Sequence, residues 1–278
     1  MRDVIRSAIE GSPASHLGHA YDVLEPVPKE DGKPDPNARD AWLTGCQQIP
    51  IASDYEWSYQ RWKQSFTSDD SKMQEVTAAS RVLVGHGNPS GSDIGLTVHR
   101  TWGVPVLPGS ALKGLVAHYV DAVYGDRGEP ERRQWLGPTW TSGRVESKDG
   151  AGAAFTGLFG APAVDGDEKA ARRGLVEFHD GLYIPGSADS KPFARDVLTV
   201  HQKKYYDGLG AQWPNDWDSP NPVGFLTVKP GTRFLIVLTG PSDWIELAMR
   251  PLLAALAEWG IGGKTSAGYG RLTLTRGA

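Results

Sequence analysis

The chain has 278 residues, of which 39% are hydrophobic and 22% are charged, and its formal net charge is −4. These values are typical of a soluble globular protein that forms one large domain or two small ones. The negative charge argues against a protein covered in basic surface, as a non-specific nucleic-acid binder would be.

The sequence contains no apolar run long enough to span a membrane and no apolar signal core near Met1. Cytoplasmic residence without a membrane partner is therefore expected. The single cysteine, Cys46, has no cysteine neighbour for a disulfide or a zinc site. No metal and no cofactor are expected.

Residues 1–77 differ in composition from the rest and are expected to form an N-terminal extension. Residues 25–40 are rich in proline, aspartate and lysine without an apolar period, which predicts a surface loop or a disordered segment. Later in the extension, aromatic residues recur at spacings of three and four, which predicts a helix that packs on the body of the protein or faces a partner. These residues are Tyr55, Tyr59, Trp62 and Phe66.

Residues 78–278 are expected to form the main domain, in which strands and helices alternate. Ser110 and Ser242 are the expected N-caps of its two helices, and Lys-Pro-Gly-Thr at 229–232 is the expected turn of a hairpin. The expected elements are a strand over 80–87, a helix from 110 to 124, a strand over 174–184, a hairpin over 223–238, a helix from 242 that Pro251 breaks or restarts, and a strand over 271–275.

This order predicts an α+β protein with a ferredoxin-like (RRM-like) fold, β-α-β-β-α-β, with long insertions and an N-terminal helical extension. Two helices would cover one face of a four-stranded antiparallel sheet, and residues from about 183 to 222 would form an insertion. The other face of the sheet, and the loops at its edge, would be free for a ligand.

The stretch GIGGKTSAGYG, residues 260–270, contains the Gly-Lys-Thr triplet of nucleotide-binding phosphate loops. Glu258 occupies the position where such a loop needs its first glycine, and a strand rather than a helix is expected after Lys264. The triplet therefore does not predict an ATP site. It needs another explanation.

Five glycines in this stretch free the backbone to approach a ligand closely, which favours an anion or RNA contact over a plain helix-to-strand connection. A plain connection remains the alternative. The residues expected to make the contact are Gly262, Gly263, Lys264, Thr265, Ser266 and Tyr269.

Two further stretches suit phosphate groups. In PGSALKG, Ser110 and Lys113 lie at the start of a helix, where unpaired N–H groups and a cation favour an anion, although the same pattern caps ordinary helices. In HQKKYYDG, Lys203 and Lys204 precede two tyrosines, which suits an RNA backbone with stacked bases. A solvated basic turn with core tyrosines is the alternative there.

The segments LPGSALKG and GIGGKTSAGYGRLTL, in this order, resemble the repeat-associated mysterious proteins, the RAMP superfamily of CRISPR RNA-guided effectors. Finer features, such as DVLTVHQKKYY, are similar to the family that forms the sixth subunit of the type III-B Cmr complex. The resemblance covers roughly residues 80–275. It implies a non-catalytic subunit that binds guide RNA (crRNA) near its 3′ end, caps one end of a stacked filament, meets target RNA in the complex, and contacts other Cmr subunits, both the RAMP backbone and the small helical ones.

RAMP nucleases often use a histidine or a loop aspartate, so His86 and Asp93 are weak catalytic candidates. The histidines of the main domain are scattered singly, and none of them pairs with another at metal-ligand spacing; they are His86, His99, His118, His179 and His201. A RAMP endoribonuclease that processes guide RNA or cuts the target is the alternative function. A purely structural stacking subunit without RNA contact is a second alternative.

Overall fold

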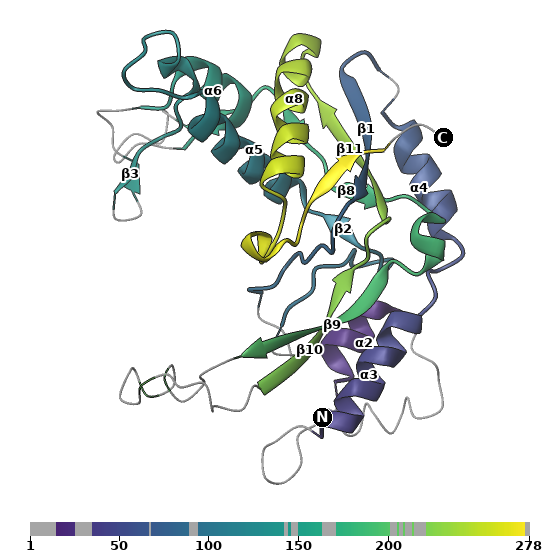
Figure 1. The fold of residues 1–278 in the computed structure, drawn as a ribbon. Coiled ribbons are helices and arrows are strands. Elements are labelled where there is room, and N and C mark those ends of the chain that lie inside the picture. Colours follow the sequence, from purple (N-terminus) through teal and green to yellow (C-terminus); the bar gives the residue numbers. More distant parts are fainter. Residues whose placement is uncertain are drawn as a thin grey trace.

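In the computed structural model, the described residues are 15–25, 35–66, 68–88, 94–141, 144–145, 150–162, 171–200, 205, 208, 213 and 221–275. Helices and antiparallel sheets make up the fold, which confirms the α+β class (Figure 1). No helix within these residues combines the length and the apolar character needed to cross a bilayer.

The main sheet has the strand order β12-β1-β11-β8-β2, with β7 also paired to β11, and all of its pairs are antiparallel. Its core runs β1-α5-β8-β11-α8-β12, which is the expected β-α-β-β-α-β order. The strands are β1 (Ser71–Ala78), β2 (Val106–Leu107), β7 (Glu177–Phe178), β8 (Gly181–Tyr183), β11 (Arg233–Thr239) and β12 (Leu272–Leu274).

The first core strand differs from the expected one. It is β1, whereas residues 82 and 83 of the expected strand over 80–87 form only isolated bridges. The expected boundary between residues 77 and 78 therefore falls inside β1. This strand has no clear apolar pattern in the sequence, because most residues of Ser71–Ala78 are polar and only Val76 and Ala78 are fully buried.

The expected hairpin over 223–238 is also wrong, because its two strands belong to different sheets. β10 (Asn221–Val228) pairs with β9 (Phe193–Val200), and β11 pairs with β1. The turn itself forms, since Thr232 N–H donates to the Lys229 carbonyl at 3.3 Å and Gly231 has a φ of 83°. A tight turn can thus join two sheets as well as two paired strands.

Helices α5 (Gly109–Tyr124) and α8 (Ser242–Glu258) contact each other and cover one face of the main sheet (Figure 1). Their N-caps are Pro108 and Pro241, so the expected serine caps are wrong, and neither helix has a side-chain cap. α8 continues through Pro251 as a single helix. The serines follow each proline as the first or second helical residue.

The opposite face of the sheet is not free. Along β11, Phe234, Ile236 and Leu238 belong to the core beneath α5 and α8, while Leu235 and Val237 pack on the other side. That second side is covered by α4 (Tyr55–Gln64), the expected aromatic helix. The open sheet face expected as a ligand surface is therefore closed by α4.

The remaining elements surround this core. α2 (Leu17–Val23) and α3 (Pro36–Gln48) pack together, and α3 lies on the β9–β10 pair (Figure 1). The smaller elements are η1 (Arg133–Trp135), β3 (Trp140–Thr141), β4 (Arg144–Val145), α6 (Ala153–Phe159), β5 (Gly160–Ala161), β6 (Arg172–Arg173), η4 (Ser187–Ser190) and η5 (Thr265–Ala267).

Candidate functional site

The glycine-rich loop, residues 260–270, connects α8 to β12 through the short turn η5. Lys264 has a φ of 58°, in the left-handed region that residues other than glycine rarely adopt. A side chain at Gly262, where φ is 90°, would place its Cβ 2.3 Å from the carbonyl oxygen of Leu83. Close packing of the backbone therefore requires this glycine even without a ligand.

Backbone hydrogen bonds join the loop to the segment that follows β1. Gly263 N–H donates to the Leu83 carbonyl at 2.7 Å, and Gly270 N–H donates to the Arg81 carbonyl at 2.7 Å. These two N–H groups are satisfied within the protein, so they cannot form part of a nest for an anion. An anion at this loop would depend mainly on side chains.

A cleft of about 560 Å³, here called the loop cleft, lies between the glycine-rich loop and α5. Thr265 and Ser266 line it from the loop, and His118 lines it from α5. The fold thus brings the loop and the first core helix, which carry two of the sequence motifs, to one surface. Hydroxyl and imidazole groups there suit hydrogen bonding to phosphate oxygens.

Arg271 completes the loop cleft at the point where the loop enters β12. Its backbone N–H donates to Ser80 Oγ at 3.0 Å, which fixes its position. Its Nη1 atom is buried and has no hydrogen-bond partner among the described residues. A buried guanidinium nitrogen without a partner is costly unless a ligand completes its bonding, and phosphate is the ligand that a guanidinium fits best.

One carboxylate also lines the loop cleft. Glu258 Oε2 accepts a hydrogen bond from the Tyr119 hydroxyl at 2.9 Å. Burial, followed by this hydrogen bond, raises the pKa of Tyr119 to about 12. The pair places the negative charge of Glu258 at the α8 side of the loop cleft, so a phosphate would lie nearer Arg271. The sequence reasoning missed Arg271, although a cation directly after the glycine-rich loop was a usable signal.

The start of α5 does not provide the expected phosphate site in free form. Gly109 N–H donates to Asp180 Oδ1 at 2.7 Å, so a carboxylate of the protein already lies at this helix end. Ser110 is exposed in the first turn, and Lys113 is half-buried. Lys113 does not line the loop cleft, although Ala111 and other residues of α5 do.

Tyr269 is half-buried, and both its hydroxyl and its ring contact other parts of the protein. Its hydroxyl donates to Asp196 Oδ2 at 2.7 Å, and its ring packs against a small core that includes Leu83 and Phe225. Burial, followed by the hydrogen bond to Asp196, raises the pKa of Tyr269 to about 12. These contacts indicate that Tyr269 positions the glycine-rich loop, and they leave its ring less available for stacking on an RNA base.

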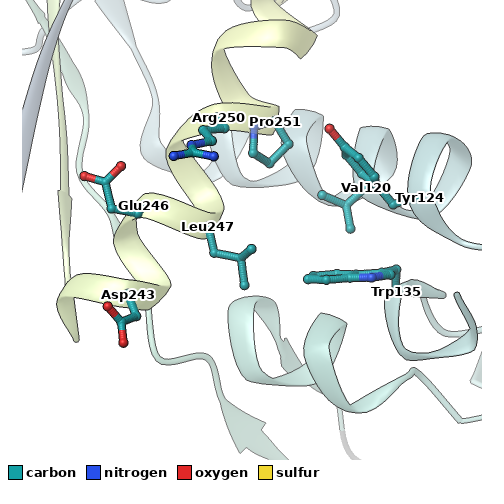
Figure 2. Close-up of a pocket in the computed structure, with 8 residues that line it drawn as sticks. All are labelled: Val120, Tyr124, Trp135, Asp243, Glu246, Leu247, Arg250 and Pro251. Atoms are coloured by element: carbon teal, nitrogen blue, oxygen red, sulfur yellow. The ribbon is translucent and has the colours of Figure 1, made fainter. Parts of the chain in front are cut away.

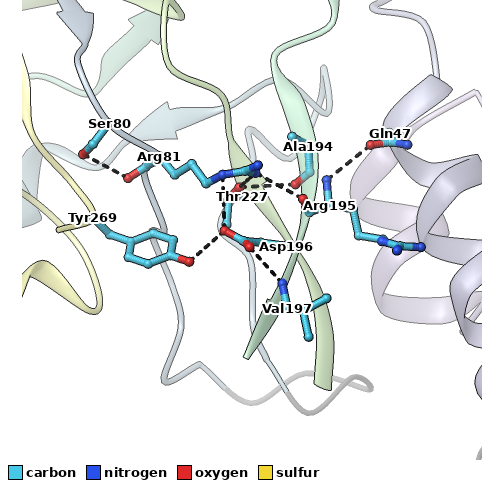
Figure 3. Close-up of polar contacts among 9 residues, drawn as sticks. All are labelled: Gln47, Ser80, Arg81, Ala194, Arg195, Asp196, Val197, Thr227 and Tyr269. Carbon is cyan, nitrogen blue, oxygen red and sulfur yellow. Dashed lines mark hydrogen bonds and ion pairs between the residues drawn. The ribbon is translucent and has the colours of Figure 1, made fainter. Parts of the chain in front are cut away.

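Asp196 is the centre of a polar network that the sequence did not reveal (Figure 3). Arg81 Nε lies 3.3 Å from Asp196 Oδ2, and Arg81 Nη1 donates to the Arg195 carbonyl at 3.1 Å and to Thr227 Oγ1 at 3.2 Å. Because Asp196 and Arg195 are on β9 and Thr227 is on β10, the network ties the β9–β10 pair to the glycine-rich loop.

Of the two catalytic candidates, His86 lies among the described residues and Asp93 does not. His86 Nδ1 is buried without a hydrogen-bond partner in the described part of the chain, and a Cβ at Gly263 would lie 2.9 Å from the His86 Cβ. Asp93, Lys203 and Lys204 lie outside the described residues. Among the residues that are described, no group of three or more His, Cys, Asp or Glu side chains could hold a metal ion.

A second hollow, of about 350 Å³, lies between α5 and α8 at Val120, Tyr124, Trp135 and Leu247 (Figure 2). Its charged residues, including Glu246, lie along α8, and the Glu246 carboxylate is paired with Lys72. Among the described residues, the one cation of its lining, Arg250, shares the hollow with the carboxylates of Asp243 and Glu246, so the hollow offers little to a phosphate group. The loop cleft is therefore the better candidate for an anion.

Residues 75–273 match the RAMP superfamily, and this match covers well over half of the chain. The protein belongs to the RAMP superfamily.

Among its relatives is CRISPR system Cmr subunit Cmr6 of Pyrococcus furiosus, which is 29% identical over 249 residues that cover 77% of this chain and 72% of the relative. A second is CRISPR system CMR subunit Cmr6 of Saccharolobus solfataricus, which is 22% identical over 205 residues that cover 73% of this chain and 57% of the relative. The fold is similar to that of a chain in the cryo-EM structure of the type III-B Cmr-beta complex bound to cognate target RNA. That chain has a TM-score of 0.60 and 20% identity, and the match covers 86% of this chain and 73% of that one.

Proposed function

We propose that the protein is a non-catalytic, guide-RNA-binding subunit of a type III-B CRISPR ribonucleoprotein effector. It caps the filament of RAMP subunits near the 3′ end of the guide RNA and contacts neighbouring Cmr subunits. The Cmr6 subunits among its relatives and the target RNA in the structurally similar complex support this assignment.

The observation that carries the RNA contact is Arg271, which lines the loop cleft and whose buried Nη1 atom has no hydrogen-bond partner among the described residues. Thr265 and Ser266 add hydroxyl groups beside it, and Lys264 lies one residue before η5. Because α4 packs on the sheet face opposite α5 and α8, stacking of bases on a fully open sheet does not account for RNA binding. The RNA backbone would instead pass along the loop edge.

The overall charge of −4 gives little long-range attraction for RNA, so the isolated chain is expected to bind RNA weakly and the assembled complex to retain it. The test is a reconstituted effector complex, prepared with and without this chain, with guide-RNA retention measured over a range of salt concentrations. A complex that retains guide RNA equally well without the chain would favour the purely structural role.

A cleavage assay with the purified chain separates the binding role from the endoribonuclease alternative. Guide and target RNA are incubated with the purified chain, with and without magnesium, and the products are sized. Intact RNA in both conditions is expected. Fragments that disappear in the His86→Ala variant would overturn the non-catalytic assignment.

A further inference from the structure

A polar hollow of about 590 Å³ lies between α2 and residues 95–100, away from the loop cleft's own lining. It is here called the α2 pocket. His16 and His19 line it from the N-terminal extension, and Arg100 lines it from the main domain. The N-terminal extension, whose residues 1–77 include 13 acidic and 8 basic residues, thus contributes two imidazoles to a site that also has a guanidinium.

The tautomer of His16 follows from its hydrogen bonds. His16 Nδ1 accepts the backbone N–H of His19 at 3.2 Å, so in the neutral ring Nδ1 is the bare nitrogen and Nε2 carries the proton. His16 Nε2 is buried and has no hydrogen-bond partner in the described part of the chain. The ring therefore holds a donor that the described protein leaves unsatisfied.

Arg100 is the strongest cation of the α2 pocket. It is exposed, and it makes no ion pair or hydrogen bond with any residue that the structure describes. One carboxylate, that of Asp22, also lines the α2 pocket. The formal charges of Arg100 and Asp22 balance, so the attraction for a ligand comes from the exposed guanidinium and from the hydrogen-bonding imidazoles, and a guanidinium suits a phosphate group in particular.

The α2 pocket is a formed part of the fold. The Tyr21 hydroxyl, on α2, donates to the Ile94 carbonyl at 2.7 Å, which holds the helix against the segment that leads to Arg100. On the facing side, Asn88 Nδ2 donates to Thr97 Oγ1 at 3.2 Å. These bonds fix both walls before any ligand binds.

The α2 pocket is also connected to the loop cleft. Leu83 forms a parallel bridge with Gly262 of the glycine-rich loop. The next residue, Val84, accepts the backbone N–H of Thr97 in the wall of the α2 pocket at 2.8 Å. A single short segment, whose residues Leu83 and Val84 are buried, therefore holds the walls of both sites in a fixed relation.

We propose that the α2 pocket binds a backbone phosphate of the RNA whose strand passes the loop cleft, with Arg100 and His19 as the groups that contact it. This inference rests on the proposed function, because it supplies a second contact for the same RNA. It assigns part of the N-terminal extension to RNA binding, although that extension is acidic as a whole.

The test uses the assembled complex and measures guide-RNA retention at several salt concentrations for Arg100→Ala, His19→Ala and the parent. Each neutralised phosphate contributes about one unit to the salt slope, so Arg100→Ala should lower the slope by roughly 1. Arg100→Lys keeps the charge and should keep most of the slope. Arg250→Ala, which removes a cation on α8, is the matched control and should leave the slope unchanged.

Cross-linking of photoreactive guide RNA to the parent complex keeps the test decisive where a variant fails to assemble. Cross-linked peptides that contain His19 or Arg100 are expected. If the parent complex retains RNA while Arg100→Ala matches Arg250→Ala and no peptide from either wall cross-links, the α2 pocket is not an RNA site and the proposed function stands. If the parent itself retains no RNA through this chain, the proposed function fails, and this inference fails with it.

Discussion

The Tyr269 hydroxyl donates a 2.7 Å hydrogen bond to Asp196, a residue 73 positions earlier in the chain. The bond joins the glycine-rich loop to β9, and Arg81 binds the same carboxylate from the other side (Figure 3). A residue that the sequence offered as a stacking surface thus positions the loop relative to the β9–β10 pair.

Tyr269→Phe should destabilise the fold by about 1 to 3 kcal/mol, because it removes a partly buried hydrogen bond to a charged group and keeps the ring. The measurement is urea unfolding of the purified chain. Tyr124→Phe is the control, since Tyr124 is 43% exposed, and it should change the free energy of unfolding little. If Tyr269→Phe and Tyr124→Phe have the same free energy of unfolding, the hydrogen bond to Asp196 does not stabilise the loop.

Stability should fall on the alkaline side as buried tyrosines ionise. Burial and then Asp196 raise the pKa of Tyr269 from 10.0 to about 12, and burial and then Glu75 raise the pKa of Tyr59 to about 12. Because the folded-state pKa is the higher one, the stabilisation is fully present below about pH 10 and is lost as the pH rises towards 12.

Urea midpoints at about pH 9 and about pH 11 provide the measurement. The parent should lose stability between these two pH values. Tyr269→Phe should lose less, because it lacks one of the tyrosine hydroxyls whose pKa is raised in the folded state. A midpoint that is constant across this range would contradict the raised pKa values.

The order of the core elements was predictable, because α5 and α8 carry clear helical periods and the apolar residues of β11 are continuous. The first strand was not, because in β1 only Val76 and Ala78 are fully buried and polar residues precede them. The pairing of β10 with β9 was also hidden, since a Pro-Gly turn sets the local bend and not the sheet to which each strand belongs.

The candidate site was predictable only in part. The glycine-rich loop and α5 were both singled out in the sequence, and the loop cleft shows that they lie at one surface. The internal use of Tyr269 and of Gly263 N–H was not predictable, because their partners, Asp196 and Leu83, are distant in sequence. Tertiary packing determines which distant residues come together, and a local sequence pattern does not contain this information.

Arg271→Ala should weaken guide-RNA retention by the assembled complex and lower the salt slope by roughly 1. It should cost the isolated chain little stability, because Nη1 of Arg271 has no partner to lose among the described residues. Arg81→Ala is the contrast, since it leaves Asp196 without its ion pair and should destabilise the chain by about 1 to 3 kcal/mol. Unchanged RNA retention in Arg271→Ala would remove the loop cleft as an RNA site.

Lys264→Ala tests the glycine-rich loop itself. It should lower the salt slope of RNA retention by roughly 1, as expected for one phosphate contact. Lys113→Ala is a direct comparison on α5. Because Lys113 lies outside the lining of the loop cleft, it should behave like Lys264 only if the RNA also passes the start of α5. If both variants match the parent while the complex assembles, the loop is a structural joint.

The aromatic helix α4 provides the last test, because its side chains divide between the core and the surface. Tyr59 is 3% exposed beneath the sheet, whereas Trp57 is 62% exposed and carries Arg61 over its ring at 4.8 Å. Tyr59→Ala should destabilise the chain by about 3 to 5 kcal/mol, as expected when a buried aromatic side chain leaves a cavity.

Trp57→Ala should cost less than about 1 kcal/mol, because it removes only an exposed ring and one cation–π contact. Thermal unfolding of the two variants measures this difference, and co-purification of each variant with the other subunits measures assembly. Normal stability with failed assembly in Trp57→Ala would place a neighbouring subunit on this helix. Normal assembly in Trp57→Ala would remove Trp57 as a contact with a neighbouring subunit. A Tyr59→Ala variant as stable as the parent would contradict the role of α4 as the cover of the sheet.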